Sequence, residues 1–297
     1  MKIATAAYPL EWFDRWPDYS AKIHSWVSNA VDQGAELLVF PEYGAMELAA
    51  LSGAAMAANE QGSIDAVNTH LESANTLFSE LSVKHGVHIL GPSAPVRSGD
   101  ITVNRAHFLT PTGGMDHQDK QIMTRFERSP WGIAGAIDGA GPLKLFDTSL
   151  GKIGVLICYD SEFPLLGKAL SDAGADIILV PSCTETTEGY WRVRIGAMAR
   201  ALEQQCVTVM SSLTGAAPAF YAVEQTIGAG GVFSPMDQGF PHDGVIALGG
   251  LGTPGWTVAD ISLDAIANVR ADGNVLNRAH WAEQPPAVAA IAQTRLR

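Results

Sequence analysis

The 297-residue sequence predicts an α/β protein in which helices cover β-sheet. Two observations carry this prediction: strand-like and helix-like patterns alternate along the chain, and 47% of the residues are hydrophobic, enough for a large core. This alternation leaves two architectures open, a three-layer doubly wound sheet and a sandwich of two sheets. Because no linker-like stretch divides the chain, we expect one main domain.

The expected elements follow from apolar runs and the turn residues that end them. The first run, near 2–8, is too short and too soon interrupted by Glu11 to be a signal segment, so it predicts a strand. The later expectations are helix 18–33, strand 35–40, helix 63–85, strands 87–91, 103–109 and 152–157, helix 163–172, strand 176–180, helix 191–205 and strand 206–212. The glycine-rich stretch 228–261 predicts antiparallel hairpins.

Cys158 follows the apolar run 153–157 and precedes a segment that reads as a helix start. A thiol at such a turn is accessible on a rigid backbone, and the free N–H groups of a following helix favour the thiolate. These features predict a nucleophile. The alternative is a buried structural cysteine, which is the commoner role for an isolated Cys.

Three further charged residues lie where the chain leaves predicted strands or turns. Glu42 ends the strand 35–40, so its carboxylate can converge with Cys158 at one sheet edge. Lys120 follows a strand and a glycine-containing turn, and Glu127 comes seven residues later. Singly, each is most often a solvated surface group. Together they predict a site with a nucleophile, a proton carrier and a cation.

These segments resemble the nitrilase superfamily of carbon–nitrogen hydrolases. The resemblance rests on Pro41-Glu42, on Lys120 after its hairpin and on the stretch from Cys158-Tyr159-Asp160 to Phe163-Pro164. It continues through 174–182, 194–203 and 230–235, so it covers roughly residues 1 to 265. It is closest to a poorly characterised bacterial branch, some members of which are fused to an acetyltransferase domain. The hydrolase pattern accounts for these 297 residues, so we expect no such domain among them.

The resemblance implies a four-layer α-β-β-α sandwich and a thiol-dependent hydrolase that cleaves a non-peptide C–N bond of a small linear amide. Cys158 would attack to form a thioester, and Glu42 would carry the proton. Lys120 and the backbone N–H after Cys158 would hold the oxyanion, while Glu127 would position Lys120 or the substrate nitrogen. Two alternatives stay open: nitrile hydrolysis by the same residues, and a non-catalytic binding protein on this scaffold. No cofactor or metal is expected.

The substrate pocket is expected near the strand end at 180, where the loop 184–191 offers carboxylates and aromatic rings but no cation. Glu185 and Trp191 from this loop are predicted substrate contacts, together with Tyr43 and Tyr159 beside the catalytic residues. They favour a cationic or neutral amide. The competing interpretation is that Glu185 and Glu188 are solvated charges that face away from the pocket.

The sequence lacks the motifs of other classes of enzyme and binding site. The sequence has no Gly-x-Ser-x-Gly, no His-Glu-x-x-His and no Cys-x-x-Cys, and the Gly-x-Gly-x-x-Gly match at 250–255 precedes a strand pattern instead of a helix. A net charge of −12 argues against a nucleic-acid partner. No apolar span reaches membrane length, and three cysteines suit a reducing cytoplasm.

Self-association is expected from the resemblance and from two segments. Residues 1–280 are assigned to the hydrolase domain, and residues 281–297 to a C-terminal tail at a dimer or higher homo-oligomer interface. The helix 191–205 has a face of small and apolar residues at Val193, Ala197, Ala201 and Leu202. That face permits either close approach of another helix or ordinary packing against the sheet.

Overall fold

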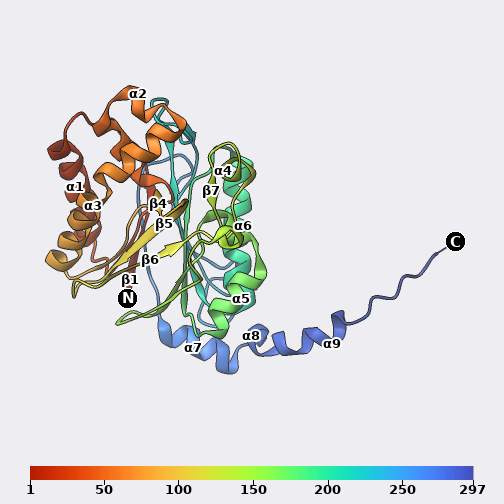
Figure 1. Ribbon diagram of the computed structural model, residues 1–297. Coiled ribbons are helices and arrows are strands. Elements are labelled where there is room, and N and C mark those ends of the chain that lie inside the picture. Colours follow the sequence, from red (N-terminus) through yellow and green to blue (C-terminus); the bar gives the residue numbers. More distant parts are fainter. Residues whose placement is uncertain (297) are drawn as a thin grey trace.

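The computed structural model describes residues 1–296 and has an α-β-β-α arrangement, with β-structure between two sets of helices (Figure 1). Each of the two β-layers contains three parallel strands. These strands are buried and rich in branched apolar residues, as is usual for parallel strands that are covered on both faces. The first three are β1 (Lys2–Tyr8), β2 (Leu37–Val39) and β3 (His88–Leu90). The second three are β9 (Gly151–Val155), β10 (Ile177–Ser182) and β11 (Val207–Leu213).

Strand β1 changes partner along its length and so joins the two halves. Residues Ile3 to Thr5 pair with β2, whereas Ala7 and Tyr8 pair with β11. The hydrogen-bonded sheet therefore curls into two facing layers instead of continuing flat. This resolves the choice that the alternating pattern left open, in favour of the sandwich.

The remaining strands extend both layers. Strands β4 (Ala94–Ser98), β5 (Ile101–Leu109), β6 (Met115–Asp119) and β7 (Ile133–Ala134) lie beyond β3. Strand β8 (Leu145–Thr148) flanks β9, β14 (Gly231–Phe233) pairs with β11 and β15 (Val245–Leu248), and β16 (Gly255–Asp260) pairs with β1. The short β12 (Gly215–Ala216) and β13 (Gln225–Thr226) pair separately.

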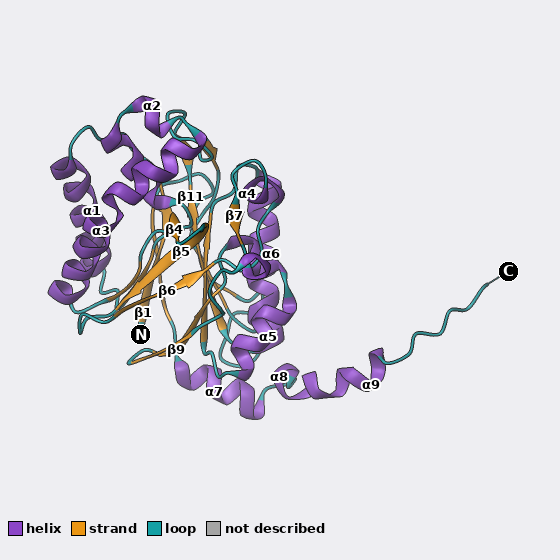
Figure 2. Ribbon diagram, in the orientation of Figure 1, coloured by secondary structure: helices purple, strands orange, loops and turns teal. Residues whose placement is uncertain are grey.

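Helices cover both outer faces (Figure 2). On one side lie α1 (Trp16–Asp32) and α3 (Glu60–His85), with the short α2 (Ala54–Ala57) above them. On the other lie α5 (Pro164–Asp172) and α6 (Thr187–Gln204). Sequence sets the ends of α3: the Asn59 side chain accepts a hydrogen bond from the Gly62 N–H, and Gly86 adopts the left-handed conformation that ends the helix.

Several expectations need correction. Strands β4, β6 and β8 were not predicted, because they contain polar residues or proline and lack long apolar runs. Helix α6 begins at Thr187, since Thr186 caps it through the Gly189 N–H. In the glycine-rich stretch, β14 and β15 form an antiparallel pair, but the loop 250–255 leads into β16, which pairs with β1. The strand after that loop excludes the dinucleotide motif.

The small-residue face of α6 packs inward. Val193, Ala197 and Ala201 are at most 1% exposed and belong to the core between this helix and the sheet. Of the two interpretations of this face, ordinary packing is therefore correct.

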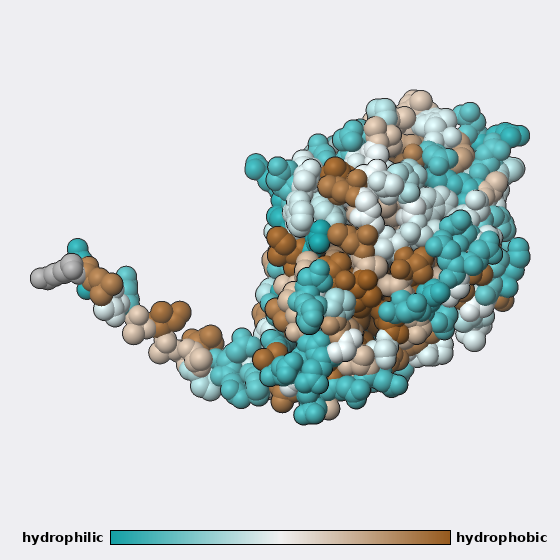
Figure 3. All heavy atoms as spheres, turned by 180° about the vertical axis from the view of Figure 1, so that it is seen from behind, coloured by the Kyte–Doolittle hydropathy of each residue, from teal (hydrophilic) through white to brown (hydrophobic). Residues whose placement is uncertain are grey.

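The C-terminal segment leaves the body after α7 (Leu263–Asp272). The Trp281 indole N–H still donates to the Glu203 carbonyl, but α9 (Gln284–Val288) and the following coil stand away from the body (Figure 3). The side chains of Ile291 and Leu296 are 90% and 91% exposed. The assignment of 281–297 to an interface stays a prediction, and its last residue lies outside the described ones. Among residues 1–296, no helix is long and apolar enough to span a membrane.

Candidate active site

Four strand ends meet at one cavity of about 180 Å³. Glu42 follows β2, Lys120 follows β6, Cys158 follows β9 and Cys183 follows β10. Parallel strands place their carboxyl ends at the same edge of a sheet, where open α/β sheets bind ligands. The other residues lining the cavity come from α4 (Arg125–Arg128), from β13 and from loops: Tyr43, Thr124, Phe126, Glu127, Trp131, Glu185, Ala222, Gln225 and Thr226.

Backbone strain is concentrated at this cavity. Among residues 1–296, four non-glycine residues have positive φ angles, and three of them, Tyr43 (55°), Cys158 (51°) and Ala222 (70°), line the cavity. Such conformations are uncommon for residues with a Cβ and are retained where the surroundings enforce them, often at functional sites. The strained turn at Cys158 is a 3₁₀ turn over Cys158–Glu162, and α5 begins only at Pro164.

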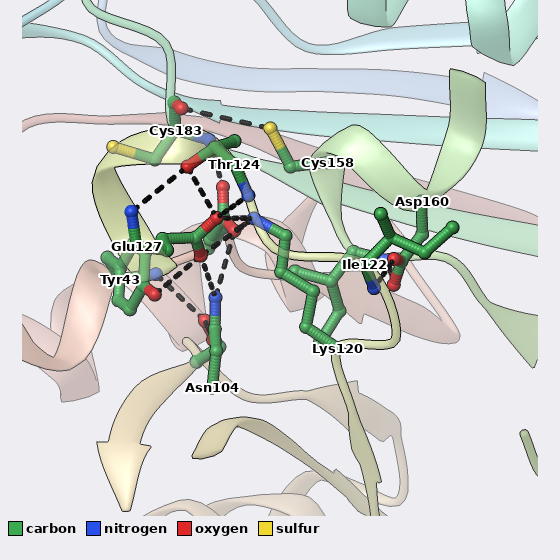
Figure 4. Close-up of polar contacts among 12 residues, drawn as sticks. Tyr43, Asn104, Lys120, Ile122, Thr124, Glu127, Cys158, Asp160 and Cys183 are labelled. Atoms are coloured by element: carbon green, nitrogen blue, oxygen red, sulfur yellow. Dashed lines mark hydrogen bonds and ion pairs between the residues drawn. The ribbon is translucent and has the colours of Figure 1, made fainter. Parts of the chain in front are cut away.

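Lys120 lies between two carboxylates (Figure 4). Its Nζ is 2.7 Å from Glu42 Oε1 and 2.8 and 2.7 Å from the two oxygens of Glu127. All three side chains are at most 4% exposed. Burial lowers the pKa of Lys120, but Glu127 and Glu42 outweigh this and hold it well above its ordinary value. The amine is therefore a fixed cation.

The surroundings of Glu42 suit a carboxylate that accepts a proton. Its Oε1 also accepts from Asn104 Nδ2 at 2.9 Å, and its Oε2 accepts from the Cys183 backbone N–H at 2.9 Å. Burial raises the pKa of Glu42 more than Lys120 lowers it, so the net shift is upward. A buried carboxylate with a raised pKa suits a general base near neutral pH.

Glu127 is held more tightly and differs in its pKa. It lies in α4, where it completes a capping box with Thr124, whose N–H and hydroxyl donate to Oε2 at 2.9 and 2.8 Å. The Tyr43 hydroxyl donates to Oε1 at 2.7 Å. Burial raises the pKa of Glu127, but Lys120 and these hydrogen bonds reverse the shift and lower it. Glu127 is thus a permanent anion that anchors Lys120.

Cys158 is 5% exposed, and its Sγ contacts the Cys183 carbonyl oxygen at 3.8 Å. Burial and the neighbouring Glu42 raise the pKa of the thiol well above its ordinary value, although Lys120 opposes them. The expectation that a helix start favours the thiolate is therefore wrong. Burial is the largest cause of the raised pKa, which favours the protonated thiol, so attack requires a base.

Asp160 ties the nucleophile turn to the Lys120 segment. Its buried carboxylate accepts from the N–H groups of Gln121, Ile122 and Ile157 at 2.7 to 3.2 Å. Burial raises the pKa of Asp160 to about 7 despite these bonds and Lys120. The carboxylate fixes the relative position of Lys120 and Cys158.

The predicted substrate contacts divide into two pairs. Tyr43 and Glu185 line the cavity, whereas Tyr159 and Trp191 do not. The Trp191 ring lies 4.7 Å from the guanidinium carbon of Arg194, and the Tyr159 ring packs edge-on against Phe163 at 4.9 Å. The structure leaves these two residues outside the cavity lining, because aromatic residues near a site in sequence can pack on neighbouring surface or helix residues instead.

Sequence reasoning missed several residues of the site. Asn104 carries a signal that could have found it, because a buried asparagine inside an apolar strand needs polar partners. Cys183 contributes through its backbone, which leaves no trace in side-chain chemistry. Phe126 lies in α4, Trp131 in the loop that follows it and Ala222 in a distant loop before β13, and only folding brings Ala222 to the same cavity.

The fold and this constellation define a class: an α/β sandwich with a buried Glu-Lys-Glu cluster beside a cysteine. The chain matches the carbon–nitrogen hydrolase family over residues 2–271, and it belongs to that family. The match includes every strand of the sandwich and all four residues of the cluster and thiol.

Individual relatives agree with this membership. The protein named probable hydrolase YhcX of Bacillus subtilis is 30% identical over 93% of this chain, and the match spans only 52% of YhcX. The chain thus covers about half the length of that relative. A deaminated glutathione amidase of Synechocystis is 26% identical over 82% of this chain and 86% of its own.

Solved structures support the fold. The amidase of Nesterenkonia sp. AN1, in a variant with acrylamide added at its active-site cysteine, superimposes with a TM-score of 0.66 at 20% identity. The match covers 92% of this chain and 97% of that one. Nit3 of Saccharomyces cerevisiae, a member of the nitrilase superfamily, superimposes with a TM-score of 0.71 at 18% identity, over 91% and 93% of the two chains.

Proposed function

We propose that this carbon–nitrogen hydrolase cleaves a small linear amide through a thioester on Cys158. The observation that carries the proposal is the thiol in one cavity with a general base of raised pKa, Glu42, and a permanently charged amine, Lys120. Amide carbons are poor electrophiles, so the reaction needs these three functions together.

In the first half-reaction, Glu42 takes the thiol proton as Cys158 Sγ attacks the amide carbon. The oxygen gains negative charge, which Lys120 Nζ and the backbone N–H of Tyr159 stabilise. Collapse breaks the C–N bond, and Glu42 returns the proton to the departing nitrogen. The products are a thioester and ammonia or an amine.

In the second half-reaction, Glu42 takes a proton from water, whose oxygen attacks the thioester carbon. The C–S bond breaks, the carboxylic acid leaves and the proton returns to Cys158. The sum is one amide and one water converted to one acid and one amine. Glu127 forms no bond in this cycle; it holds Lys120 in place through both oxygens.

The direct test is ammonia release from a panel of primary amides, carbamoyl compounds and nitriles. Cys158→Ala is expected to abolish release while the circular dichroism spectrum is unchanged, since one small side chain at a cavity is lost. Cys183→Ala is the matched control: it also lines the cavity, but its known contacts are made by its backbone, so activity should persist. Release by Cys158→Ala equal to wild type contradicts the covalent mechanism.

We also propose that the chain self-associates through the outer face of α5 and α6 and that the reaction takes place in the cytoplasm. Leu165, Trp191 and Ile195 are 75%, 45% and 61% exposed on this face, which supports a protein contact there. All three cysteines are free, which suits a reducing compartment. Analytical ultracentrifugation of wild type and Ile195→Glu tests the interface, and an unchanged mass of the variant argues against it.

A further inference from the structure

Glu185 stands out among the residues that line the cavity. It lies on the loop between β10 and α6, is exposed, and has no hydrogen-bond or ion-pair partner within residues 1–296. Its charge nevertheless reaches the site: with burial and Glu42 as larger causes, Glu185 contributes to the raised pKa of Cys183. Glu185 is therefore a free carboxylate at the rim of the cavity, and no step of the hydrolysis uses it.

The charges that line the cavity are mostly negative. Three are carboxylates, Glu42, Glu127 and Glu185, and Lys120 is the one cation among the lining residues that the structure describes. Lys120 is already shared between two of the carboxylates. A substrate carboxylate would find no free positive partner here and would be repelled, whereas an ammonium would be attracted.

Nearby arginines do not change this balance. Arg128 faces Asp138 at 3.9 Å and Arg192 faces Glu162 at 3.4 Å, and neither lines the cavity. Arg125 is exposed on the first turn of α4 and does not line the cavity either. Recognition of a substrate carboxylate by arginine has no candidate residue in the cavity wall.

The apolar part of the wall suits a cation as well. Tyr43, Phe126 and Trp131 line the cavity, with the Trp131 ring centroid 4.9 Å from Tyr43 and 5.8 Å from Phe126. Aromatic faces attract ammonium groups, and more strongly where water is excluded. The volume of about 180 Å³ limits the occupant to a short chain.

We propose that the substrate is a short linear amide whose far end carries an ammonium group, with Glu185 as its counter-ion and the aromatic wall along its methylene chain. This inference rests on the proposed hydrolysis and adds the substrate class and the residue that selects it. Cys158 and its partners act on the amide end, and Glu185 acts only on the charged end.

The experiment compares kcat/KM for three amides with the same three-methylene spacer: 4-aminobutanamide, pentanamide and glutaramate. These end in an ammonium, a methyl group and a carboxylate. Wild type is expected to prefer 4-aminobutanamide to pentanamide by about tenfold and to disfavour glutaramate most, the scale of one charge-assisted contact. Raising the salt from about 0.05 to about 0.5 M should reduce the preference, since Glu185 is exposed.

Three variants separate the effect of Glu185 from the effect of the general negative charge of the chain. Glu185→Gln should lower kcat/KM for 4-aminobutanamide by roughly tenfold and leave pentanamide within about twofold. Glu188→Gln is the matched control, because Glu188 lies three residues further on, in the first turn of α6, and is exposed but does not line the cavity, so the change should alter neither value. Glu185→Lys should reverse the order of 4-aminobutanamide and glutaramate.

The outcomes distinguish this inference from the proposed function. Cys158-dependent ammonia release with no preference for the ammonium, or with a preference for glutaramate, overturns the substrate class and leaves the hydrolase intact. An equal effect of Glu185→Gln on all three amides overturns the role of Glu185. Absence of Cys158-dependent release across the whole panel of amides, carbamoyl compounds and nitriles overturns the proposed function itself.

Discussion

Residues 1–296 contain two buried groups in which a lysine pairs with glutamate, and Glu42 of one group is only five residues from Glu47 of the other. The groups differ in what surrounds the ion pair. In the active-site cluster (Glu42, Lys120, Glu127 and Cys158), one ammonium faces two carboxylates beside a cavity and a thiol. In the second group, which we call the Lys22 cluster (Tyr8, Lys22 and Glu47), one ammonium faces one buried carboxylate away from that cavity, and the exposed Glu11 carboxylate lies 3.5 Å from it.

The polar groups of the Lys22 cluster form hydrogen bonds with one another and with nearby backbone. Glu47 accepts from the Tyr8 hydroxyl at 2.7 Å, from the Glu11 N–H at 2.7 Å and from Lys22. Lys22 also donates to the Pro9 carbonyl and lies 4.2 Å from the centre of the Tyr8 ring. Burial raises the pKa of Glu47, as it does that of Glu42.

The comparison teaches that burial, ion pairing and a raised pKa do not by themselves identify an active site. Both clusters have all three. The active-site cluster adds a second buried carboxylate, a nucleophile and space for a substrate, whereas the Lys22 cluster joins the loop after β1, helix α1 and the 3₁₀ segment Gly44–Ser52. The first group of side chains is arranged for chemistry and the second for stability.

The largest expected effect comes from removing the base. Glu42→Gln should lower turnover by about a hundredfold or more, the usual scale for a general acid–base group. Little stability should be lost, because Lys120 still donates hydrogen bonds to both carboxylate oxygens of Glu127. Glu47→Gln, the matched change in the Lys22 cluster, should leave turnover per folded molecule within about threefold. Steady-state kinetics on folded protein decide the matter, and the reverse ranking would show that the base has been misassigned.

The next effect concerns stability. Lys22→Met leaves Glu47 buried without its cation and should lower the free energy of unfolding by about 3 kcal/mol at pH 8. The sign of the pH dependence follows from Glu47, whose folded-state pKa is raised by burial and rises further without Lys22. Stability is then retained below the ordinary pKa of a glutamate, near 4.5, and lost as the pH rises through the folded-state value. Urea unfolding at pH 4.5 and pH 8 measures the difference.

The double variant Lys22→Met/Glu47→Gln is the control for that result. It removes both charges, so it should recover more than half of the lost stability at pH 8. No recovery would mean that Lys22 contributes mainly through its contacts with Pro9 and Tyr8. Neither variant is expected to alter turnover per folded molecule.

The smallest expected effect lies in the pH profile of activity. Glu42 must be ionised to accept the thiol proton, so kcat/KM should fall as the pH falls through a pKa above the ordinary value of 4.5. The same acid limb should appear in Glu47→Gln, because the two carboxylates belong to separate clusters. A limb that moves in Glu47→Gln would couple the two clusters and weaken the distinction between them.

Much of the site was predictable because its residues follow apolar runs that can only be buried strands. Glu42, Cys158, Lys120 and Glu127 were identified as candidates from strand and turn patterns, and the family resemblance implied their roles. Trp191 does not line the cavity, because a sequence shows that an aromatic ring is near a strand end but not which way it turns. The state of Cys158 was mispredicted for a related reason, since the pKa of a thiol depends on neighbours that the fold supplies.

The sequence by itself determined the alternation of strands and helices, the positions of the strand ends and the types of residue placed there. These depend on local patterns of apolar and turn residues, which act over a few positions. Only the tertiary structure decided that β1 would join two sheets, that Trp191 would lie outside the cavity lining, and that Glu185 would line the cavity instead of facing away from it. These outcomes depend on contacts between residues separated by dozens of positions, and such contacts exist only once the two layers have packed together.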